Sequence, residues 1–267
     1  MTETAHGPSV PPPVPGHDLL AGRTVVVTAA AGAGIGAAAA RRCLEEGARA
    51  VVLGDIHERR LAETRRALAE EFGAGRVAAE ICDVTVEEQV QALLDAAEPF
   101  GGVDVLINNA GLGGTRSVLE MTDGEWARVL DISLTGAFRC VRAAGNRMVR
   151  AGRRGVIVNN ASVVGWRAQE GQAHYAAAKA GVMALTRCAA MDLAEHGIRV
   201  NAVSPSLAMH PHLAKVTTAE FLDTLTSREA FGRAAEPWEV ASVMAFLASD
   251  YSSYMTGEVV SVSSQHA

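Results

Sequence analysis

Short apolar runs alternate with longer amphipathic stretches along most of the chain. The apolar runs predict strands at Thr24–Thr28, Ala50–Leu53, Val77–Ile81, Val103–Ile107, Gly155–Asn159, Ile198–Val203 and Glu258–Val262. The stretches between them predict helices at Gly34–Gly47, Glu58–Phe72, Val86–Ala97, Glu125–Val149 and His174–His196. Strands that are apolar throughout and joined by helices indicate a parallel sheet covered on both faces. The pattern therefore predicts a doubly wound α/β fold.

Composition adds a domain boundary and excludes several classes of protein. Residues 1–17 contain a Pro-rich stretch and lack both a basic start and an apolar run, which predicts a disordered tail ahead of a single domain over 18–267. The net charge of −6 argues against a nucleic-acid surface. No apolar run reaches the roughly 18 residues of a membrane span. Four scattered cysteines indicate a cytoplasmic protein without a metal site.

A tyrosine and a lysine stand four residues apart, at Tyr175 and Lys179. The chain holds only two lysines beside 22 arginines, so this pairing is unusual. Residues four apart share one helix face, and the ammonium there can bring the pKa of the phenol from near 10 toward neutrality. The pair predicts a proton donor and acceptor. The alternative is an accidental pair on a surface helix.

Glycines fill the turn between the first predicted strand and helix, in the run Thr28-Ala-Ala-Ala-Gly32-Ala-Gly34-Ile35-Gly36. Glycines there let the backbone approach a pyrophosphate whose charge the helix N-terminus stabilises. Asp55 stands at the end of the second strand, where a carboxylate accepts hydrogen bonds from ribose hydroxyls and repels a 2′-phosphate. No arginine lies in Ala29–Ala33 or at Ile56, which favours NAD over NADP. The alternative for the glycines is an ordinary tight turn, and the alternative for Asp55 is a helix N-cap.

Polar residues follow three further strands. Asp83-Val84 follows the third strand, Asn108-Asn109-Ala110-Gly111 ends the fourth, and Ser162 follows the fifth. The carboxyl ends of parallel strands meet at the edge where ligands of open α/β folds bind. The hydroxyl of Ser162 can donate to a substrate carbonyl as charge builds on its oxygen. Ordinary turn chemistry is the alternative for each segment.

Together these residues resemble the short-chain dehydrogenase/reductase family, from about residue 20 to 262. The resemblance implies a Rossmann-type domain in which Tyr175 exchanges a proton with the substrate oxygen. It further implies that Lys179 lowers the phenol's pKa and bonds the nicotinamide ribose, while Ser162 positions the substrate oxygen. Asn108 is expected on the adenosine side. The expected cofactor-binding residues are Thr28, Gly32, Gly34, Ile35, Gly36, Asp55, Asp83, Val84, Asn109, Ala110, Gly111, Tyr175, Lys179, Pro205 and Leu207.

Four segments depart from the family's pattern. The usual Thr-Gly of the first turn is Thr28-Ala29. Ser133 replaces an asparagine that helps hold a proton-relay water, and we expect its hydroxyl to serve in that catalytic role. His210 stands where a threonine commonly contacts the nicotinamide amide. After the last strand, Ser261-Val-Ser-Ser-Gln265 replaces the usual Asp-Gly-Gly.

Within the family, the sequences around Ser162 and Tyr175 are most similar to bacterial 3-oxoacyl-thioester reductases. This resemblance implies a homotetramer and a substrate lid at about 205–235 that includes Leu207, Met209, His210 and Leu213. Apolar lid residues favour a coenzyme A thioester or a sterol-derived alcohol over a sugar. We therefore expect an NAD(P)-dependent oxidoreductase that interconverts a secondary alcohol and a ketone. The alternatives are a 3-oxoacyl-acyl-carrier-protein reductase and a non-catalytic dinucleotide-binding scaffold.

One basic residue bears on the choice between coenzyme A and a carrier protein. Arg139 matches a position with which carrier-protein-using relatives dock their acidic partner, but the second basic position is Met191 followed by Asp192. With half of that patch and a negative net charge, steering toward an acidic carrier protein is expected to be weak. The sequence therefore predicts a preference for coenzyme A-linked or sterol-like substrates.

Overall fold

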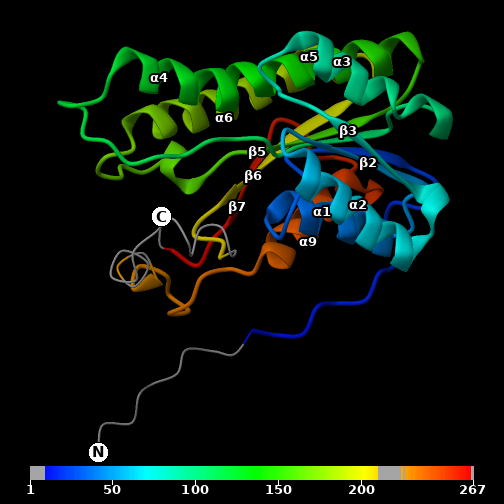
Figure 1. Cartoon of the computed structure of the whole chain (residues 1–267), viewed down its shortest axis with the longest axis horizontal. Helices are drawn as coiled ribbons and strands as arrows, with labels where there is room; N and C mark the ends of the chain where they lie inside the picture. Colours follow the sequence, from blue (N-terminus) through cyan, green and yellow to red (C-terminus); the bar gives the residue numbers. More distant parts are fainter. Residues whose placement is uncertain (1–9, 210–223, 225, 266–267) are drawn as a thin grey trace, which may run out of the picture.

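A seven-stranded parallel sheet forms the centre of the protein in the computed structural model, which describes residues 10–209, 224 and 226–265 (Figure 1). The strands are β1 (Thr24–Thr28), β2 (Ala50–Asp55), β3 (Val77–Ile81), β4 (Val105–Asn108), β5 (Val156–Asn160), β6 (Arg199–Pro205) and β7 (Val259–Val262). They lie in the order β3-β2-β1-β4-β5-β6-β7, and every neighbouring pair is parallel. The order reverses between β1 and β4, where open α/β sheets bind ligands at their carboxyl edge.

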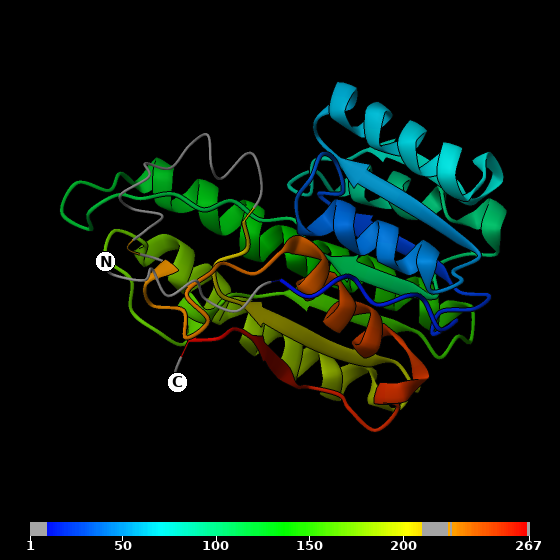
Figure 2. The same cartoon turned by 90° about the horizontal axis from the view of Figure 1, so that it is seen from below.

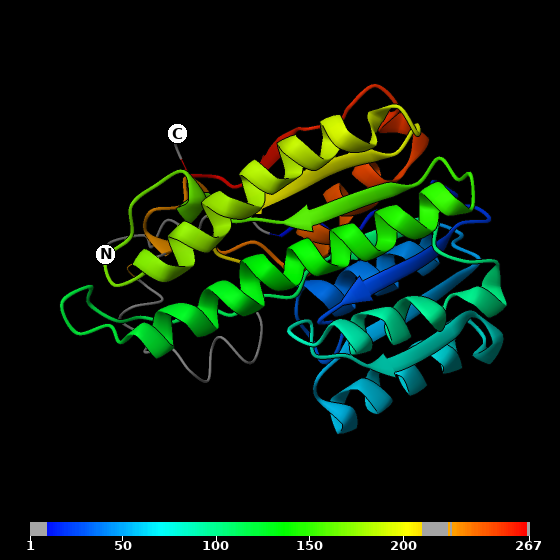
Figure 3. The ribbon, with the colours of Figure 1, turned by 90° about the horizontal axis from the view of Figure 1, so that it is seen from above.

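Helices cover both faces of this sheet. One face carries α1 (Ile35–Glu45), α2 (Glu58–Phe72) and α9 (Pro237–Ala248), which lie together in Figure 2. The other face carries α3 (Glu87–Asp95), α5 (Gly136–Arg150) and α6 (Ala173–Ala194), seen in Figure 3. The remaining elements are α4 (Asp123–Leu130), the π-helical η3 (Asp131–Thr135) and the 3₁₀ turns η1 (Ala74–Arg76), η2 (Glu98–Phe100), η4 (Val163–Gly165) and η5 (Asp250–Ser252).

Two hydrophobic cores result, one on each side of the sheet. Successive side chains of a strand point to opposite faces, so Val25 and Val27 pack toward α1 and α9, whereas Val26 packs toward α3 and α5. All three side chains are fully buried. The predicted doubly wound fold is therefore confirmed, and the continuous apolar strands are explained by burial on both faces.

The helices differ from the sequence-based expectation in two places. The predicted helix Glu125–Val149 is present but is interrupted by the π-helical turn η3, after which α5 continues. Helix α9 was not predicted at all. Its residues Val240, Ala241, Met244 and Leu247 are buried against α1, so the segment lacks the polar face by which a surface helix is recognised.

The described end of the expected N-terminal tail contacts the domain. The Glu46 carboxylate is fully buried and accepts hydrogen bonds from the amides of His17 and Leu19. Arg42 pairs with Glu46 and donates to the Val14 carbonyl. Residues 14–17 are thus attached to α1, whereas we had expected the disordered tail to extend through residue 17.

Candidate active site

The turn between β1 and α1 presents bare backbone at the carboxyl edge of the sheet. Gly34 caps α1 without a side-chain hydrogen bond. A Cβ at Gly32 or Gly34 would meet no atom within 4 Å, and Gly32 has a φ of +84°. At Gly36, by contrast, a Cβ would lie 2.1 Å from the Ala29 carbonyl oxygen, so only glycine fits there. The helix N-terminus is therefore open to an anion such as a pyrophosphate.

Thr28 and Asn109 fasten this turn to the end of β4. The Thr28 hydroxyl accepts hydrogen bonds from the amides of Asn109 and Ala110, both at 2.9 Å. In return, Asn109 Nδ2 donates to the carbonyls of Thr28 and Ala29, both at 3.2 Å. The side chains of these two predicted cofactor-binding residues therefore shape the turn from within.

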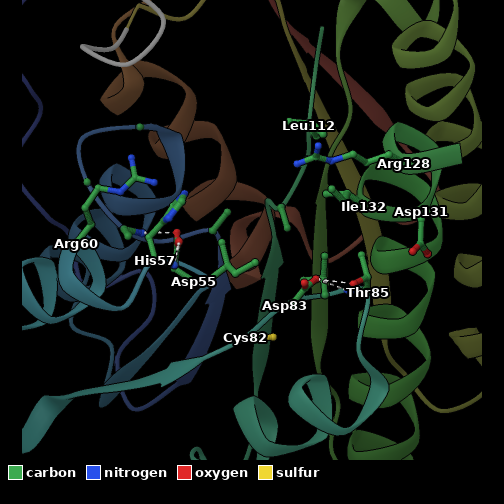
Figure 4. A pocket seen from close by; sticks show the side chains of 18 of the residues that line it. Asp55, His57, Arg60, Cys82, Asp83, Thr85, Leu112, Arg128, Asp131 and Ile132 are labelled. Carbon is green, nitrogen blue, oxygen red and sulfur yellow. Dashed lines mark hydrogen bonds between the residues drawn. The ribbon is translucent and has the colours of Figure 1, made fainter. Parts of the chain in front are cut away.

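Asp55 lies at the end of β2 with its carboxylate held in place. One oxygen accepts from the Ala31 amide at 3.0 Å and the other from the His57 amide at 2.9 Å. Burial raises the pKa of this carboxyl above its ordinary value, while the Ala31 hydrogen bond and the positive charge of Arg60 act in the opposite direction. Figure 4 shows Asp55, His57 and Arg60 together on one side of a cavity.

This cavity has a volume of about 1220 Å³. It is lined by the glycine turn, by Asp55, Asp83 and Val84, and by Ala110 and Gly111. From the opposite side, α4 and the π-helical turn contribute Arg128, Asp131 and Ile132, and Arg128 extends into the cavity in Figure 4. An open helix N-terminus and a fixed carboxylate that line one cavity fit a dinucleotide.

Tyr175 and Lys179 lie just beyond the Gly111 wall of the cavity. A Cβ at Gly111 would lie 3.2 Å from Lys179 Nζ, and one at Gly113 would lie 3.9 Å from the Tyr175 ring. Lys179 is 2% exposed, donates from Nζ to the Asn160 carbonyl at 2.6 Å, and lies 5.5 Å from the centroid of the Tyr175 ring. The Tyr175 hydroxyl and Ser162 share a hydrogen bond. The structure thus brings together all three residues selected from the sequence.

Burial dominates the ionisation of the tyrosine and lysine. Loss of hydration lowers the pKa of Lys179 from 10.5 to about 8. Loss of hydration also raises the pKa of Tyr175 above 10, and its hydrogen bond with Ser162 only partly opposes this effect. We had expected a lowered phenol pKa. Burial of the phenol produces the opposite direction, and the expected lowering also included the positive charge of the oxidised nicotinamide.

Two predicted residues serve the backbone instead of facing the cavity. Ser133 Oγ accepts from the Leu112 amide at 2.9 Å and donates to the Leu112 carbonyl at 3.1 Å. Its hydroxyl therefore holds the loop after β4. Asn108 Nδ2 donates to the Ala137 carbonyl and to Asn159 Oδ1, both at 3.0 Å. Asn108 is thus a core residue, which corrects its expected place on the adenosine side.

The end of β6 and the segment that follows it lie beside Ser162. Ser162 Oγ donates to the Pro205 carbonyl at 3.5 Å. Beyond it, the Met209 amide donates to the Ala235 carbonyl at 2.9 Å, and the Ala235 amide donates to the Leu207 carbonyl at 2.8 Å. The predicted lid residues His210 and Leu213 lie outside the described residues.

Several residues at this edge were not selected as site residues from the sequence. In the sequence, Arg60 and Arg128 look like ordinary arginines of surface helices. Only their position along the cavity wall distinguishes them from the other arginines. Within the described part of the chain, no group of three or more His, Cys, Asp or Glu residues is arranged to hold a metal ion. None of the described helices combines the length and apolarity that crossing a bilayer requires.

Comparison with known proteins agrees with this geometry. Residues 29–264 match the family model described as enoyl-(acyl carrier protein) reductase. The chain is 63% identical over 257 residues to (5R,7aS)-5-hydroxy-7a-methyl-1-oxo-2,3,5,6,7,7a-hexahydro-1H-indene-carboxyl-CoA reductase of Mycobacterium tuberculosis, covering 96% of this chain and 97% of that protein. It is 45% identical over 248 residues to cis-4-hydroxycyclohexanecarboxylate dehydrogenase of Sinomonas cyclohexanicum, covering 92% and 96%. The crystal structure of a short chain dehydrogenase from Mycobacterium smegmatis matches with a TM-score of 0.86 at 58% identity, covering 97% and 99%.

The chain therefore belongs to the short-chain dehydrogenase/reductase family. It is an oxidoreductase that interconverts secondary alcohols and ketones and uses a nicotinamide dinucleotide as cofactor.

Proposed function

We propose that the protein oxidises or reduces a ring-bearing secondary alcohol or ketone whose carboxyl group is held as a coenzyme A thioester. The observation that carries the proposal is the near full-length similarity to a reductase of a fused-ring carboxyl-CoA. A second relative acts on a hydroxycyclohexane carboxylate, which is again a ring alcohol with a carboxyl group. A sterol-derived ring system combines these features.

We assign the chemistry to Tyr175, Lys179 and Ser162. The bound nicotinamide supplies the acceptor or donor of hydride. Tyr175 gives its phenolic proton to the substrate oxygen during reduction and takes it back during alcohol oxidation. Ser162, which already bonds the phenol, donates to the same substrate oxygen. Lys179, fixed on the Asn160 carbonyl, supplies positive charge that stabilises the phenolate and a donor for the nicotinamide ribose.

NAD is the cofactor that Asp55 favours. The carboxylate is fixed by two backbone amides, so it cannot swing away from a 2′-phosphate. Arg60 lines the same cavity and offers a cation that the first turn itself lacks. Because Arg60 already interacts with the Asp55 carboxylate, we assign it to moderating the preference for NAD, not to reversing it.

A carrier-protein substrate is disfavoured by the surroundings of Arg139. Its guanidinium donates to Asp131 at 2.9 Å, and the Arg139 side chain is 22% exposed. On α6, Met191 is 77% exposed in the position where a second basic residue would be needed. An acidic carrier would therefore find one neutralised arginine in place of a basic patch.

We further assign the protein to the cytoplasm as a homotetramer. Exposed apolar side chains on the two long helices support this assembly, among them Phe138 on α5 at 42% exposure and Met191 on α6. Such side chains on one pair of helices are typical of a surface that another copy covers.

A comparison of three substrates tests the proposal. Purified protein is supplied with NAD and, at equal concentration, with cis-4-hydroxycyclohexanecarboxylate, its coenzyme A thioester, or the same acyl group on acyl carrier protein. Formation of NADH gives kcat/KM for each. We expect the coenzyme A thioester to be oxidised with the highest kcat/KM. A clear preference for the carrier-protein substrate would overturn the proposal and indicate a role in fatty-acid synthesis.

A further inference from the structure

A buried glutamate joins the C-terminal segment to the backbone that leaves β6. Glu229 is 4% exposed. Its Oε1 accepts hydrogen bonds from the Leu207 amide at 3.4 Å and from Gln265 Nε2 at 2.8 Å, and its Oε2 accepts from the Ser264 hydroxyl at 2.8 Å. A carboxylate taken out of water needs such donors. Glu229 therefore holds together two segments that are far apart in the sequence.

Gln265 extends this connection to the loop that follows Ser162. While its Nε2 donates to Glu229, its Oε1 accepts from Arg167 Nη1 at 2.8 Å and its backbone carbonyl accepts from Arg167 Nη2 at 3.5 Å. Arg167 lies just after η4, which Ser162 caps. We call Arg167, Glu229, Ser264 and Gln265 the C-terminal clamp.

The clamp acts on the backbone beside the reaction centre. Leu207, whose amide Glu229 holds, comes two residues after Pro205, and the Pro205 carbonyl lies 3.5 Å from Ser162 Oγ. The Leu207 carbonyl in turn accepts from the Ala235 amide, so the segment that leaves β6 is joined to the segment at Ala235 by an isolated bridge. Both the loop after Ser162 and the joined segments at Leu207 and Ala235 are thus anchored through the Gln265 side chain.

We propose that Glu229 and Gln265 are positioning residues that hold the backbone after β6 against Ser162 and thereby set how the substrate oxygen meets the reaction centre. The proposal rests on the catalytic roles proposed for Ser162 and Tyr175. It also gives a role to the C-terminal Ser261–Gln265 segment, which departs from the family's usual sequence. Asp55 and the glycine turn, which are expected to bind the adenosine and pyrophosphate part of the dinucleotide, lie at β1 and β2. Pro205 and Leu207 are expected only beside its nicotinamide end.

The test separates positioning from general stability. Removing both side-chain bonds with Gln265→Ala is expected to lower kcat by about tenfold, since a small misplacement at the reaction centre is costly to the rate. The KM for the alcohol should stay within about threefold, and the Kd for NADH, measured by its fluorescence, within about twofold, because neither depends mainly on orientation. Glu195→Gln is the control, because the Glu195 side chain is 80% exposed and lies outside the clamp. Its kcat, KM and Kd for NADH should equal those of the wild type.

A charge variant sharpens the test. Gln265→Glu retains a partner for Arg167 but sets a second carboxylate against Glu229, so kcat should fall at least as far as in Gln265→Ala. Adding Glu229→Gln removes this repulsion, so kcat of the double variant should rise above that of Gln265→Glu. If Gln265 served only to attach the C-terminus to Arg167, Gln265→Glu would be tolerated, and this outcome would overturn the proposal.

The assay uses whichever of cis-4-hydroxycyclohexanecarboxylate or its coenzyme A thioester the wild type oxidises best. Failure of the coenzyme A proposal would then appear as a preference for a free alcohol, while the clamp variants would still be compared on an active substrate. A wild-type kcat in Gln265→Ala, or a loss of NADH binding in parallel with the loss of kcat, would overturn the positioning role proposed for the clamp.

Discussion

The carboxyl edge of the sheet has a cofactor side, at β1 and β2, and a reaction side, at β5 and α6, and the two sides present different chemical groups. At the end of β1 and β2, the surface offered to the cofactor is mostly backbone, with open space beside Gly32 and Gly34. At the end of β5 and on α6, the surface offered to the substrate consists of ionisable side chains, Tyr175 and Lys179, whose burial disfavours their charged forms. The comparison shows that the cofactor side combines exposed backbone with one carboxylate held by backbone amides, whereas burial on the reaction side disfavours the charged forms of its own side chains.

Removing the phenol should break the reaction side and spare the cofactor side. Tyr175→Phe deletes the proton donor and acceptor, so kcat should fall by about 100-fold or more. Because Tyr175 lies beyond the Gly111 wall, the Kd for NADH should change little. Steady-state rates and NADH fluorescence measure both quantities. A variant that keeps more than about a tenth of the wild-type rate would show that another group transfers the proton.

Removing the buried ammonium should abolish turnover and raise stability. The fall of the Lys179 pKa from 10.5 to about 8 corresponds to about 3 kcal/mol against folding at neutral pH. After allowing about 1 kcal/mol for the lost bond to Asn160, Lys179→Met should raise the free energy of unfolding by about 2 kcal/mol. Urea denaturation of the ligand-free protein measures this difference.

The pH dependence of that difference checks its cause. Between pH 8 and 10.5 the unfolded chain holds a proton on Lys179 that the folded chain has released, so wild-type stability rises with pH in this window. The advantage of Lys179→Met should therefore be full below pH 8 and should disappear as the pH approaches 10.5. An advantage that is independent of pH would mean that improved packing, not desolvation, is responsible.

On the cofactor side, charge should decide between the two dinucleotides. Wild type should use NAD with a kcat/KM about 30-fold above that for NADP, because a fixed carboxylate facing a 2′-phosphate costs about 2 kcal/mol. Asp55→Ala should narrow the ratio and Arg60→Ala should widen it. Arg59→Ala is the matched control, since Arg59 is 82% exposed and pairs with Glu63. Equal efficiency of the wild type with NAD and NADP would refute the argument.

The smallest expected effect concerns the first turn. Ala29 has a φ of +51°, a left-handed conformation that costs an alanine about 1–2 kcal/mol relative to glycine. The greater freedom of glycine in the unfolded chain offsets part of this, so Ala29→Gly should stabilise the fold by about 0.5–1 kcal/mol. Ala33→Gly in the same turn is the control, and urea denaturation measures both variants. Since Ala33 does not adopt a positive φ, the control should be neutral or destabilising.

Much of the cofactor side could be predicted because its residues follow local rules. Continuous apolar runs such as Val51–Leu53 are explained by burial on both faces, and glycines mark the turn where the backbone is exposed to a ligand. Tyr175 and Lys179 could be found because a four-residue spacing is itself a contact on a helix. In each case the signal lies within a few neighbouring residues.

The remaining features depend on contacts between distant segments. Helix α9 is buried against α1 and has no polar face to reveal it. Arg128 belongs to the site only because the helix that carries it passes the cavity. Glu229 meets Gln265 across 36 positions of sequence. No local pattern encodes such a contact.

The π-helical turn at Asp131–Thr135 has a genetic consequence. Each turn of this kind holds one residue more than an α-helical turn, which rotates the downstream residues by about 100° around the helix axis. Upstream of it, Ala127 and Arg128 face the cavity, whereas downstream Cys140, Ala144 and Met148 face the core. Loss of a single codon between 131 and 135 would therefore change the phase of the helix. The residues that face the cavity and those that face the core could then no longer both keep their orientations. The same loss in the loop before α4 would shorten only a loop.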